Sequence, residues 1–389
     1  MKPKKFISLF TFFFLRFASG AAFRPYLVLY YQSLSFSGSQ IGLLTGVIPL
    51  ISLASMPLMT GLADRTKTHK LIMSISLITA SFGVFIFPYL NSFLLIFILL
   101  ILVSILIAPV GALSDSAAMF MLGERKDLFS RIRLGGTLGF SIASAAVGSL
   151  VENYGLKIAF WIASALLFIA FLVSLNLVHA PEESKKPADM RQAIVLLKKP
   201  RVLLFLLISF AGGLSNALVN TYLFPYLRNL GAGESVMGLA LTIGTIAELP
   251  ILFFISTFIK KYKGFKLVIF STAVTSLRFL LLAITTNPSV VLIIQLLNGF
   301  TFPLLSVAGV TYADEHAPEG FHATSQGLFN IASIGIGSAM GGFVGGLLFE
   351  RLGGRGMYLV FFIFITIVLI FASLMHRILP PEKRGEASI

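Results

Sequence analysis

The chain has 389 residues, of which 57% are hydrophobic and only 12% are charged. Soluble domains carry about 25% charged residues, so this composition, with a mean hydropathy of +0.93, excludes a soluble protein and indicates an integral membrane protein. The net charge of +14 would suit nucleic acid, but its distribution along the chain argues against that partner. The absence of cysteine excludes disulfides, thiolate metal sites and thiol catalysis.

Twelve apolar runs are long enough to cross a bilayer, which takes about 20 residues each. They lie near 6–31, 39–63, 70–90, 93–116, 134–151, 158–179, 202–228, 235–258, 267–286, 290–313, 324–349 and 356–377. The first run is expected to be a retained helix rather than a signal peptide, because Arg16 interrupts it and further spans follow. The sequence therefore predicts an all-α membrane protein with 12 transmembrane helices.

Basic residues are concentrated on one side of these spans. If the N-terminus is cytoplasmic, most of the 30 Lys and Arg fall in cytoplasmic loops and tails. The outer loops would hold Lys157, Arg228, Arg351 and Arg355. This asymmetry follows the positive-inside rule. It predicts a cell-membrane protein with both termini in the cytoplasm, whose partner is the lipid bilayer and not nucleic acid.

One long polar segment, near 180–201, separates two sets of six spans. The expected organisation is a six-helix bundle over 1–180, a cytoplasmic linker over 181–200 and a second six-helix bundle over 201–389. The halves echo each other: VGSLVENYG (147–155) resembles GGLLFERLG (345–353), and SQIGLL (39–44) resembles SVMGLA (235–240). Parallel six-helix repeats with a site at their interface are typical of one large class of transporters.

The loop after the second span carries the first family resemblance. GLADRTKTHK (61–70) lies where the major facilitator superfamily has a Gly-x-x-x-Asp-Arg-x-Gly-Arg-Arg pattern. Asp64 and Arg65 match, whereas Thr60 and Lys67 replace the two glycines. The resemblance covers essentially the whole chain. It implies the twelve-helix, two-bundle fold of that superfamily, a functional monomer, and a gating role for Asp64 and Arg65.

Three stretches resemble the lactose permease and phenylpropionate permease type of proton symporter. They are residues 109–140, 246–254 and 276–284, which contain Asp115 with Arg133, Glu248, and Arg278. The resemblance implies that Asp115 and Arg133 bind substrate, that Glu248 is essential, and that Arg278 belongs to the same site.

The tenth span departs from that pattern. Asn298 stands where lactose permease has a histidine, and Thr301 stands where it has the glutamate that carries the proton. Lactose is therefore not expected as the substrate, nor is an identical proton site.

Charges embedded in spans are the candidate functional groups, because such residues face a bundle interior or an aqueous cavity and pair with one another. The acids are Asp115 and Glu248; the bases are Arg16, Arg24 and Arg278, with Arg133 at the entry of the fifth span. At least one positive charge therefore lacks a fixed partner. Three interpretations remain open: structural pairs with snorkelling arginines, an arginine that binds an anionic substrate group, or an arginine that controls the protonation of an acid.

Proton coupling needs a carboxyl group that exchanges a proton with a water-filled cavity near neutral pH. Glu248 is the first candidate for the proton carrier and Asp115 the second. Amides are weaker candidates for the substrate site. Asn216 and Asn220 lie four residues apart in the seventh span, and Asn298 lies in the tenth; hydrogen bonds between helices are the alternative explanation.

An enzyme is not expected. The five histidines lie in loops or at span ends without metal-ligand spacing, and no Gly-Lys-Ser/Thr phosphate loop is present. The sequence therefore predicts a secondary transporter without cofactor or metal, driven by the proton gradient. It would take up a small polar or anionic solute, such as a sugar, nucleoside or aromatic acid, by alternating access. The alternative is a proton-antiport exporter of drugs or metabolites.

Overall fold

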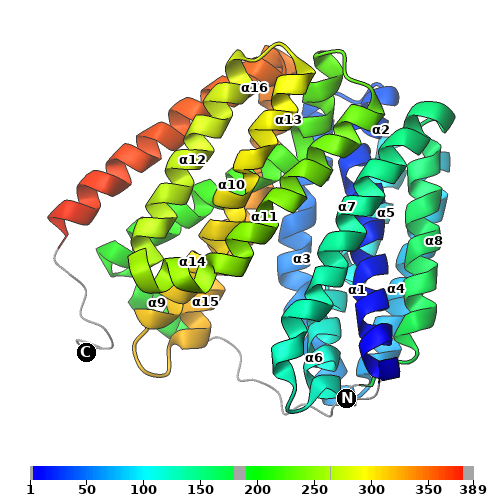
Figure 1. The fold of residues 1–389 in the computed structure, drawn as a ribbon, viewed down its shortest axis with the longest axis horizontal. Coiled ribbons are helices and arrows are strands. Elements are labelled where there is room, and N and C mark those ends of the chain that lie inside the picture. Colours follow the sequence, from blue (N-terminus) through cyan, green and yellow to red (C-terminus); the bar gives the residue numbers. More distant parts are fainter. Residues whose placement is uncertain (1–2, 179–189, 263, 380–389) are drawn as a thin grey trace. The chain divides into compact units, whose positions relative to one another are not determined.

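The computed structural model describes residues 3–178, 190–262 and 264–379. Within these residues every regular element is a helix, as Figure 1 shows. Contacts divide the chain into two compact units. The first unit comprises Met1–Gln40, Leu50–Lys185 and Gly231–Ile246; the second comprises Ile41–Pro49, Lys186–Leu230 and Ala247–Ile389. The predicted linker, 181–200, lies outside the described residues as far as residue 189, and the predicted bundle boundaries stay a prediction.

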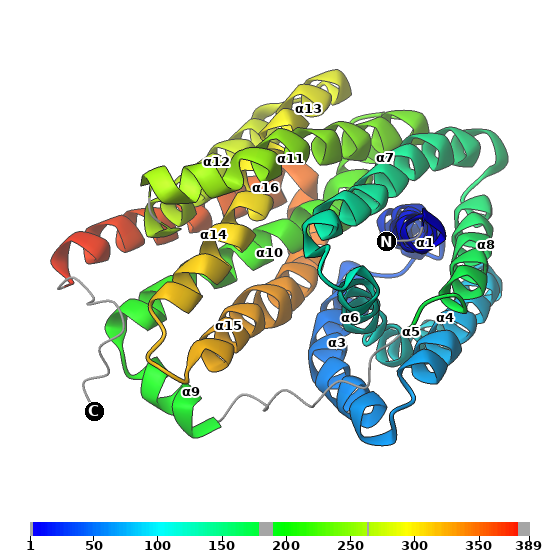
Figure 2. The same ribbon diagram turned by 60° about the horizontal axis from the view of Figure 1, so that its bottom comes forward.

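Helices from the first half of the chain build most of the first unit. They are α1 (Pro3–Phe23), η1 (Arg24–Tyr26), α2 (Leu27–Ser33), α3 (Gly38–Thr66), α4 (His69–Ile86), η2 (Phe87–Tyr89), α5 (Phe93–Ile107), α6 (Val110–Leu122), η3 (Lys126–Leu128), α7 (Phe129–Tyr154) and α8 (Lys157–Ser174). In Figure 2, α1 is seen end-on between α7 and α8, and it packs against both.

Helices from the second half of the chain build most of the second unit, although α11 begins in the first unit. They are α9 (Met190–Leu197), α10 (Pro200–Asn229), α11 (Glu234–Tyr262), α12 (Gly264–Ile284), α13 (Pro288–Ile294), η4 (Gln295–Phe300), α14 (Phe302–Glu315), α15 (His322–Asn330), the π-helix η5 (Ile331–Gly337) and α16 (Ser338–Ile378). In this unit α16 packs against α10 and α12.

Eleven helical runs in the described part of the chain are long and apolar enough to cross a membrane. The last, His322–Ile378, has 57 residues and contains both of the final two predicted spans. Its backbone breaks at Gly353, which has φ 67° and ψ 178°. Glycine tolerates positive φ at no steric cost, so a single residue separates the two spans without a longer loop.

Glycines of α7 bring its backbone against α1 in the first unit. A Cβ at Gly135 would lie 2.9 Å from the Phe10 carbonyl oxygen, and one at Gly139 would overlap the backbone of Phe14. Small residues at helix interfaces permit this close approach in membrane proteins, where apolar burial does not drive association. The position of α1, and hence of Arg16, is therefore fixed by backbone packing.

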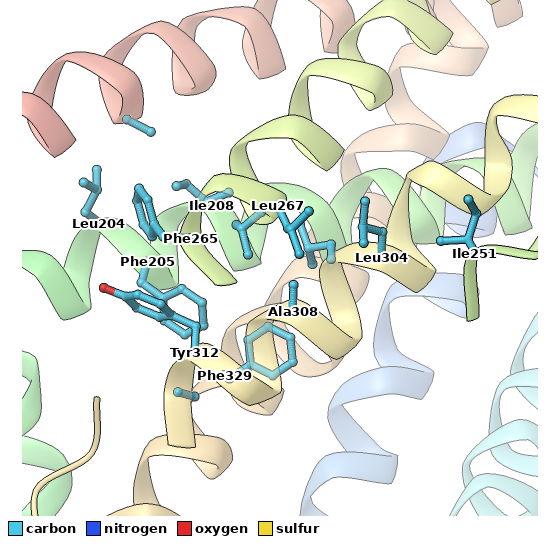
Figure 3. Close-up of a cluster of buried hydrophobic side chains, with 14 residues drawn as sticks. Leu204, Phe205, Ile208, Ile251, Phe265, Leu267, Leu304, Ala308, Tyr312 and Phe329 are labelled. Carbon is cyan, nitrogen blue, oxygen red and sulfur yellow. The ribbon is translucent and has the colours of Figure 1, made fainter. Parts of the chain in front are cut away.

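The core of the second unit is an aromatic and aliphatic cluster drawn in Figure 3. Phe205 of α10, Phe265 of α12, Tyr312 of α14 and Phe329 of α15 meet there, all at most 7% exposed. The rings of Phe205 and Tyr312 are 4.8 Å apart, and those of Phe265 and Tyr312 are 5.3 Å apart. This cluster fixes the spacing of α12 and α14, which frame the polar site of this unit.

The matching sequence segments make equivalent contacts in the two units. In the first unit Gly238 of α11 lies against the Ser144 carbonyl of α7. In the second unit a Cβ at Gly42 of α3 would lie 2.8 Å from the Phe343 carbonyl oxygen of α16 and 3.4 Å from that of Gly342. Gly42 and Gly238, which hold matching places in the repeated segments SQIGLL and SVMGLA, are thus positions of close helix approach, one in each unit.

Candidate functional site

The tenth predicted span is broken in the second unit. α13 ends at Ile294, the 3-10 helix η4 covers Gln295–Phe300, and α14 begins after Thr301, whose φ is −95° and ψ −121°. The hydroxyl of Ser271, on α12, donates to the Thr301 carbonyl at 2.7 Å. This carbonyl also accepts the Leu305 N–H at the start of α14, so the serine adds a bond between α12 and the break. The break places three polar side chains, those of Gln295, Asn298 and Thr301, opposite α12.

Arg278 of α12 is 3% exposed and faces this break. Its Nη1 donates to Asn298 Oδ1 at 2.6 Å, and its Nη2 donates to Gln295 Oε1. A weaker contact of 3.5 Å joins Nη1 to the Thr301 hydroxyl. Among the described residues the Arg278 Nε has no hydrogen-bond partner. The buried guanidinium is therefore held by amide oxygens on the broken span.

Glu248 of α11 completes the network. The Asn298 Nδ2 donates to Glu248 Oε1 at 2.6 Å, and the carboxylate is half-buried. The two charges that the sequence suggested as a pair are therefore joined through the Asn298 amide. Because Arg278 takes the amide oxygen, the amide nitrogen is left to face the acid. Glu248, Arg278 and Asn298, all predicted site residues, lie together in one unit.

A second cluster lies in the first unit around Arg16. This half-buried side chain donates from Nη1 to the Ser114 hydroxyl of α6 at 3.4 Å, and its Cζ is 5.4 Å from the centroid of the Phe17 ring. A Cβ at Gly111 would come within 3.1 Å of Arg16 Nη2. The lack of a side chain at Gly111 therefore makes room for the guanidinium beside α6.

Asp115 follows Ser114 on α6 and is half-buried. It interacts electrostatically with Arg133 of α7 and with Arg16. Arg133 is exposed, and its Cζ lies 5.9 Å from the Phe129 ring centroid. Within the described residues, however, no carboxylate lies within 4.0 Å of any nitrogen of Arg16, Arg24 or Arg133. The acid and the bases share a neighbourhood without a direct ion pair.

Arg24 begins η1, at the point where Pro25 ends the regular α-helical run of α1. Its side chain is exposed, and it interacts electrostatically with Arg16. In the described part of the chain its guanidinium makes no hydrogen bond or ion pair with another residue. Arg24 therefore differs from Arg278, whose guanidinium is occupied by fixed acceptors.

Asn216, the remaining predicted substrate residue, lies on α10 in the second unit. Asn220 donates from Nδ2 to Asn216 Oδ1 at 2.9 Å and to the Asn216 carbonyl at 2.9 Å. Asn220 is exposed and Asn216 half-buried. The two amides form a polar ladder along one side of α10.

The predicted gating residues end α3. Asp64 is bonded to His69, the first residue of α4, with 2.7 Å between Oδ1 and Nε2, and Arg65 is exposed. Lys67 adopts the left-handed conformation, φ 55° and ψ 31°, as the C-cap of α3. This is the position at which the superfamily pattern has glycine, which is common at such caps because it has no Cβ.

Four residues that support these clusters were not assigned from the sequence: Gly111, Ser114, Ser271 and His69. Gly111 and Ser114 precede Asp115 by one helical turn and by one residue, which is a weak local signal. Ser271 and Arg278 are seven residues apart on α12 and so share one face. The spacing between Asp64 and His69 carries no comparable indication.

Comparisons with known proteins identify the family of this chain. The MFS_1 like family model matches residues 6–375. Maltose permease of Geobacillus stearothermophilus is 29% identical over 363 residues, covering 92% of this chain and 90% of that protein. Xanthosine permease of Escherichia coli is 23% identical and covers 81% of each chain.

Solved structures of the same fold also match. The crystal structure of the nucleoside transporter NupG has a TM-score of 0.86 at 20% sequence identity, covering 96% of this chain and 99% of that one. The predicted all-α twelve-helix fold is thereby confirmed. The permease relatives are transporters and not enzymes, as the sequence indicated. The chain is a multi-pass membrane transporter, and it belongs to the MFS_1 like family of the major facilitator superfamily.

Proposed function

We propose that this protein is a secondary active transporter that takes up a small polar solute of the sugar or nucleoside type together with protons. The carrying observation is the chain of contacts from Arg278 through Asn298 to Glu248. It would act as a monomer in the cell membrane with both termini cytoplasmic, as the distribution of basic residues predicts.

The network suits proton coupling. Removal from water favours the neutral form of a carboxyl group, and a guanidinium in direct contact favours the charged form. Glu248 bonds to the amide of Asn298, while Arg278 bonds to amide oxygens. The acid can therefore change protonation state without the breakage of a direct ion pair, and we assign it as the proton carrier. Asp115 is the second candidate, because it too lies among bases without a close ion pair.

The substrate class rests on two supports. Relatives are named as permeases for maltose, xanthosine and nucleosides, all of which present hydroxyl groups. Asn220 and Arg133 are exposed polar groups on spans and Asn216 is partly exposed, a placement that suits hydrogen bonding to such solutes. Asp64 and Arg65, at the end of α3, are proposed to take part in gating.

The experiment measures external pH in lightly buffered, de-energised cells that express the protein, while solutes are added singly. The panel contains maltose, lactose, uridine, xanthosine and phenylpropionate. We expect alkalinisation with one class of solute, lost in Glu248→Gln cells because the amide cannot carry a proton. Glu350→Gln is the matched control, since Glu350 is exposed on α16 and should leave the response intact.

A second assay separates binding from coupling. Glu248→Gln should abolish accumulation against a gradient but preserve exchange of labelled for unlabelled substrate. Accumulation at the wild-type level in this variant would contradict the assignment of Glu248. No alkalinisation by any solute, together with increased resistance to toxic compounds, would favour the alternative of a proton-antiport exporter.

A further inference from the structure

The positive charge embedded in this protein is unevenly distributed between its two units. In the second unit Arg278 and Glu248 are one base and one acid, linked through Asn298. In the first unit Asp115 interacts electrostatically with Arg133 and Arg16, and Arg16 also interacts with a third base, Arg24. The excess of positive charge therefore resides in the first unit, along α1 and its neighbours.

Arg16 of α1 and Arg24, the first residue of η1, flank an open space beside Gly20. Arg16, Gly20 and Arg24 follow one another at intervals of four residues, so they lie along one side of the helix over roughly 12 Å of its axis. A Cβ at Gly20 would meet no atom within 4 Å. Other sides of α1 are filled: Phe14 lies against Gly139 of α7, and Ser19 donates to the Ala163 carbonyl of α8 at 2.9 Å.

The side of α1 that carries Arg16 and Gly20 is too polar to face lipid. An arginine at membrane depth is unfavourable by roughly 2.5–3.5 kcal/mol even on insertion scales, so a space beside two of them is expected to hold water. Arg16 offers five N–H donors. Among the described residues its one hydrogen bond is the 3.4 Å contact with Ser114. Arg24 makes none there. Both guanidiniums thus retain donors for a ligand.

We propose that the side of α1 between Arg16 and Arg24 binds an anionic group, a carboxylate or a phosphate, of the transported solute. This inference rests on the proposed transport function and narrows its substrate class to sugar or nucleoside derivatives that carry a negative charge. A guanidinium binds either oxyanion through two parallel hydrogen bonds. Ser114 and the absence of a side chain at Gly111 position Arg16 for this role.

The test is equilibrium binding by isothermal titration calorimetry to the purified full-length protein in nanodiscs. The probes are matched pairs: glucose with glucuronate, glucose with glucose 6-phosphate, and uridine with uridine monophosphate. Inorganic phosphate is included as a minimal anion. We expect the charged member of at least one pair to bind at least 10-fold more tightly than its neutral partner. The glucuronate and phosphate arms distinguish a carboxylate from a phosphate.

Variants assign the effect to α1. Arg24→Gln and Arg16→Gln should each reduce the preference for the charged member to less than 3-fold. Arg24→Lys, which keeps the charge but not the planar fork, should give an intermediate loss. Arg351→Gln is the control, because Arg351 is exposed on α16; it should keep the wild-type preference. If Arg16→Gln fails to fold, the Arg24 variants alone decide the question.

Equal affinity for charged and neutral members, or an unchanged preference in Arg24→Gln, would overturn the inference. So would failure of every charged probe and of phosphate to bind the wild type. If one of these results occurred while a neutral sugar or nucleoside was still taken up together with protons, the anion site would be ruled out but the proposed transport function would remain supported. Conversely, an Arg24-dependent preference for anions without any proton-coupled movement of solute would support the subsite and contradict the proposed symport.

Discussion

Arg278 and Glu248 are joined through one amide, with 2.6 Å from the Arg278 Nη1 to Asn298 Oδ1 and 2.6 Å from Asn298 Nδ2 to Glu248 Oε1. The guanidinium orients the amide, and the amide orients the carboxylate. A change in the charge of Glu248 therefore alters the hydrogen bonds at the break in the tenth span, where Asn298 and Gln295 both contact Arg278. This gives protonation a route to a helix interruption, the kind of element that can adopt two arrangements.

Asn298→Ala should disconnect the two charges. It leaves the buried Arg278 with one amide acceptor fewer, and loss of a partner to a buried charged donor costs on the order of 1–3 kcal/mol. We expect a lower thermal unfolding midpoint in detergent and a reduced number of protons moved per solute. Asn153→Ala is the control, since Asn153 is exposed and bonds only within its own helix, to the Ser149 carbonyl at 2.8 Å. An unchanged proton-to-solute ratio would argue against Asn298 as the coupling element.

Ser271→Ala should weaken the broken tenth span itself. Its hydroxyl donates to the Thr301 carbonyl at the break, and this carbonyl also accepts the Leu305 N–H at the start of α14. The carbonyl keeps the Leu305 N–H as a partner, so we expect destabilisation of about 0.5–1.5 kcal/mol, the net contribution of one hydrogen bond. Thermal unfolding of the purified protein measures it. Ser209→Ala removes an equally buried hydroxyl that bonds within α10, to the Phe205 carbonyl, and should have little effect. Equal effects of the two variants would contradict a special role for Ser271.

Gly238→Ala should destabilise the first unit, because its Cβ would overlap the Ser144 carbonyl of α7. Backbone cannot yield as a flexible side chain can, so a loss of about 1–3 kcal/mol is expected for such overpacking. Gly61→Ala provides the opposite case. Gly61 lies within α3 with no atom near its added Cβ, and alanine there should stabilise by roughly 0.5–1 kcal/mol. Thermal midpoints of the two variants should therefore shift in opposite directions.

Lys67→Gly should stabilise the end of α3. Lys67 adopts φ 55°, and the left-handed conformation costs a residue with a Cβ roughly 1–2 kcal/mol, which glycine avoids. The gain is reduced by the greater freedom of glycine in the unfolded chain, so we expect an increase of about 0.5–1 kcal/mol. Lys70→Gly, placed inside α4, should be destabilising by a similar amount. A lower thermal midpoint for Lys67→Gly would show that the lysine side chain contributes more than its backbone strain removes.

Several features of the fold were predictable from the sequence for identifiable reasons. Apolar runs of membrane-spanning length define spans because lipid forces every backbone group to bond within its own helix. The last two spans were separable at the correct point because glycine at 353 permits the positive φ that breaks them. The repeat was visible because close backbone approach, as at Gly42 and Gly238, admits almost no other residue.

The candidate site was predictable only in part. Charged residues within apolar runs stand out, so Arg16, Asp115, Glu248 and Arg278 could be found, and resemblance to a permease type added Arg133. The hydrogen bonds and ion pairs that these residues make could not be found from the sequence. Direct pairs between acid and base were one expectation, whereas Arg278 turns to two amides and Asp115 has bases nearby without contact. Which donor meets which acceptor depends on the rotation of each helix about its axis and on the place where the tenth span breaks. Neither property produces a periodic pattern of residues in the sequence.

The sequence by itself determined that the chain crosses a membrane, how many times, which residues are too polar to face lipid, and to which superfamily it belongs. The first three follow from local hydrophobicity, which each segment carries independently of the others, and the superfamily follows from a short motif around Asp64 and Arg65. Only the tertiary structure decided that Asn298 stands between Arg278 and Glu248, and that Gly20 leaves open space between two arginines. Both depend on helices far apart in the chain, whose packing is set by many side-chain volumes acting together.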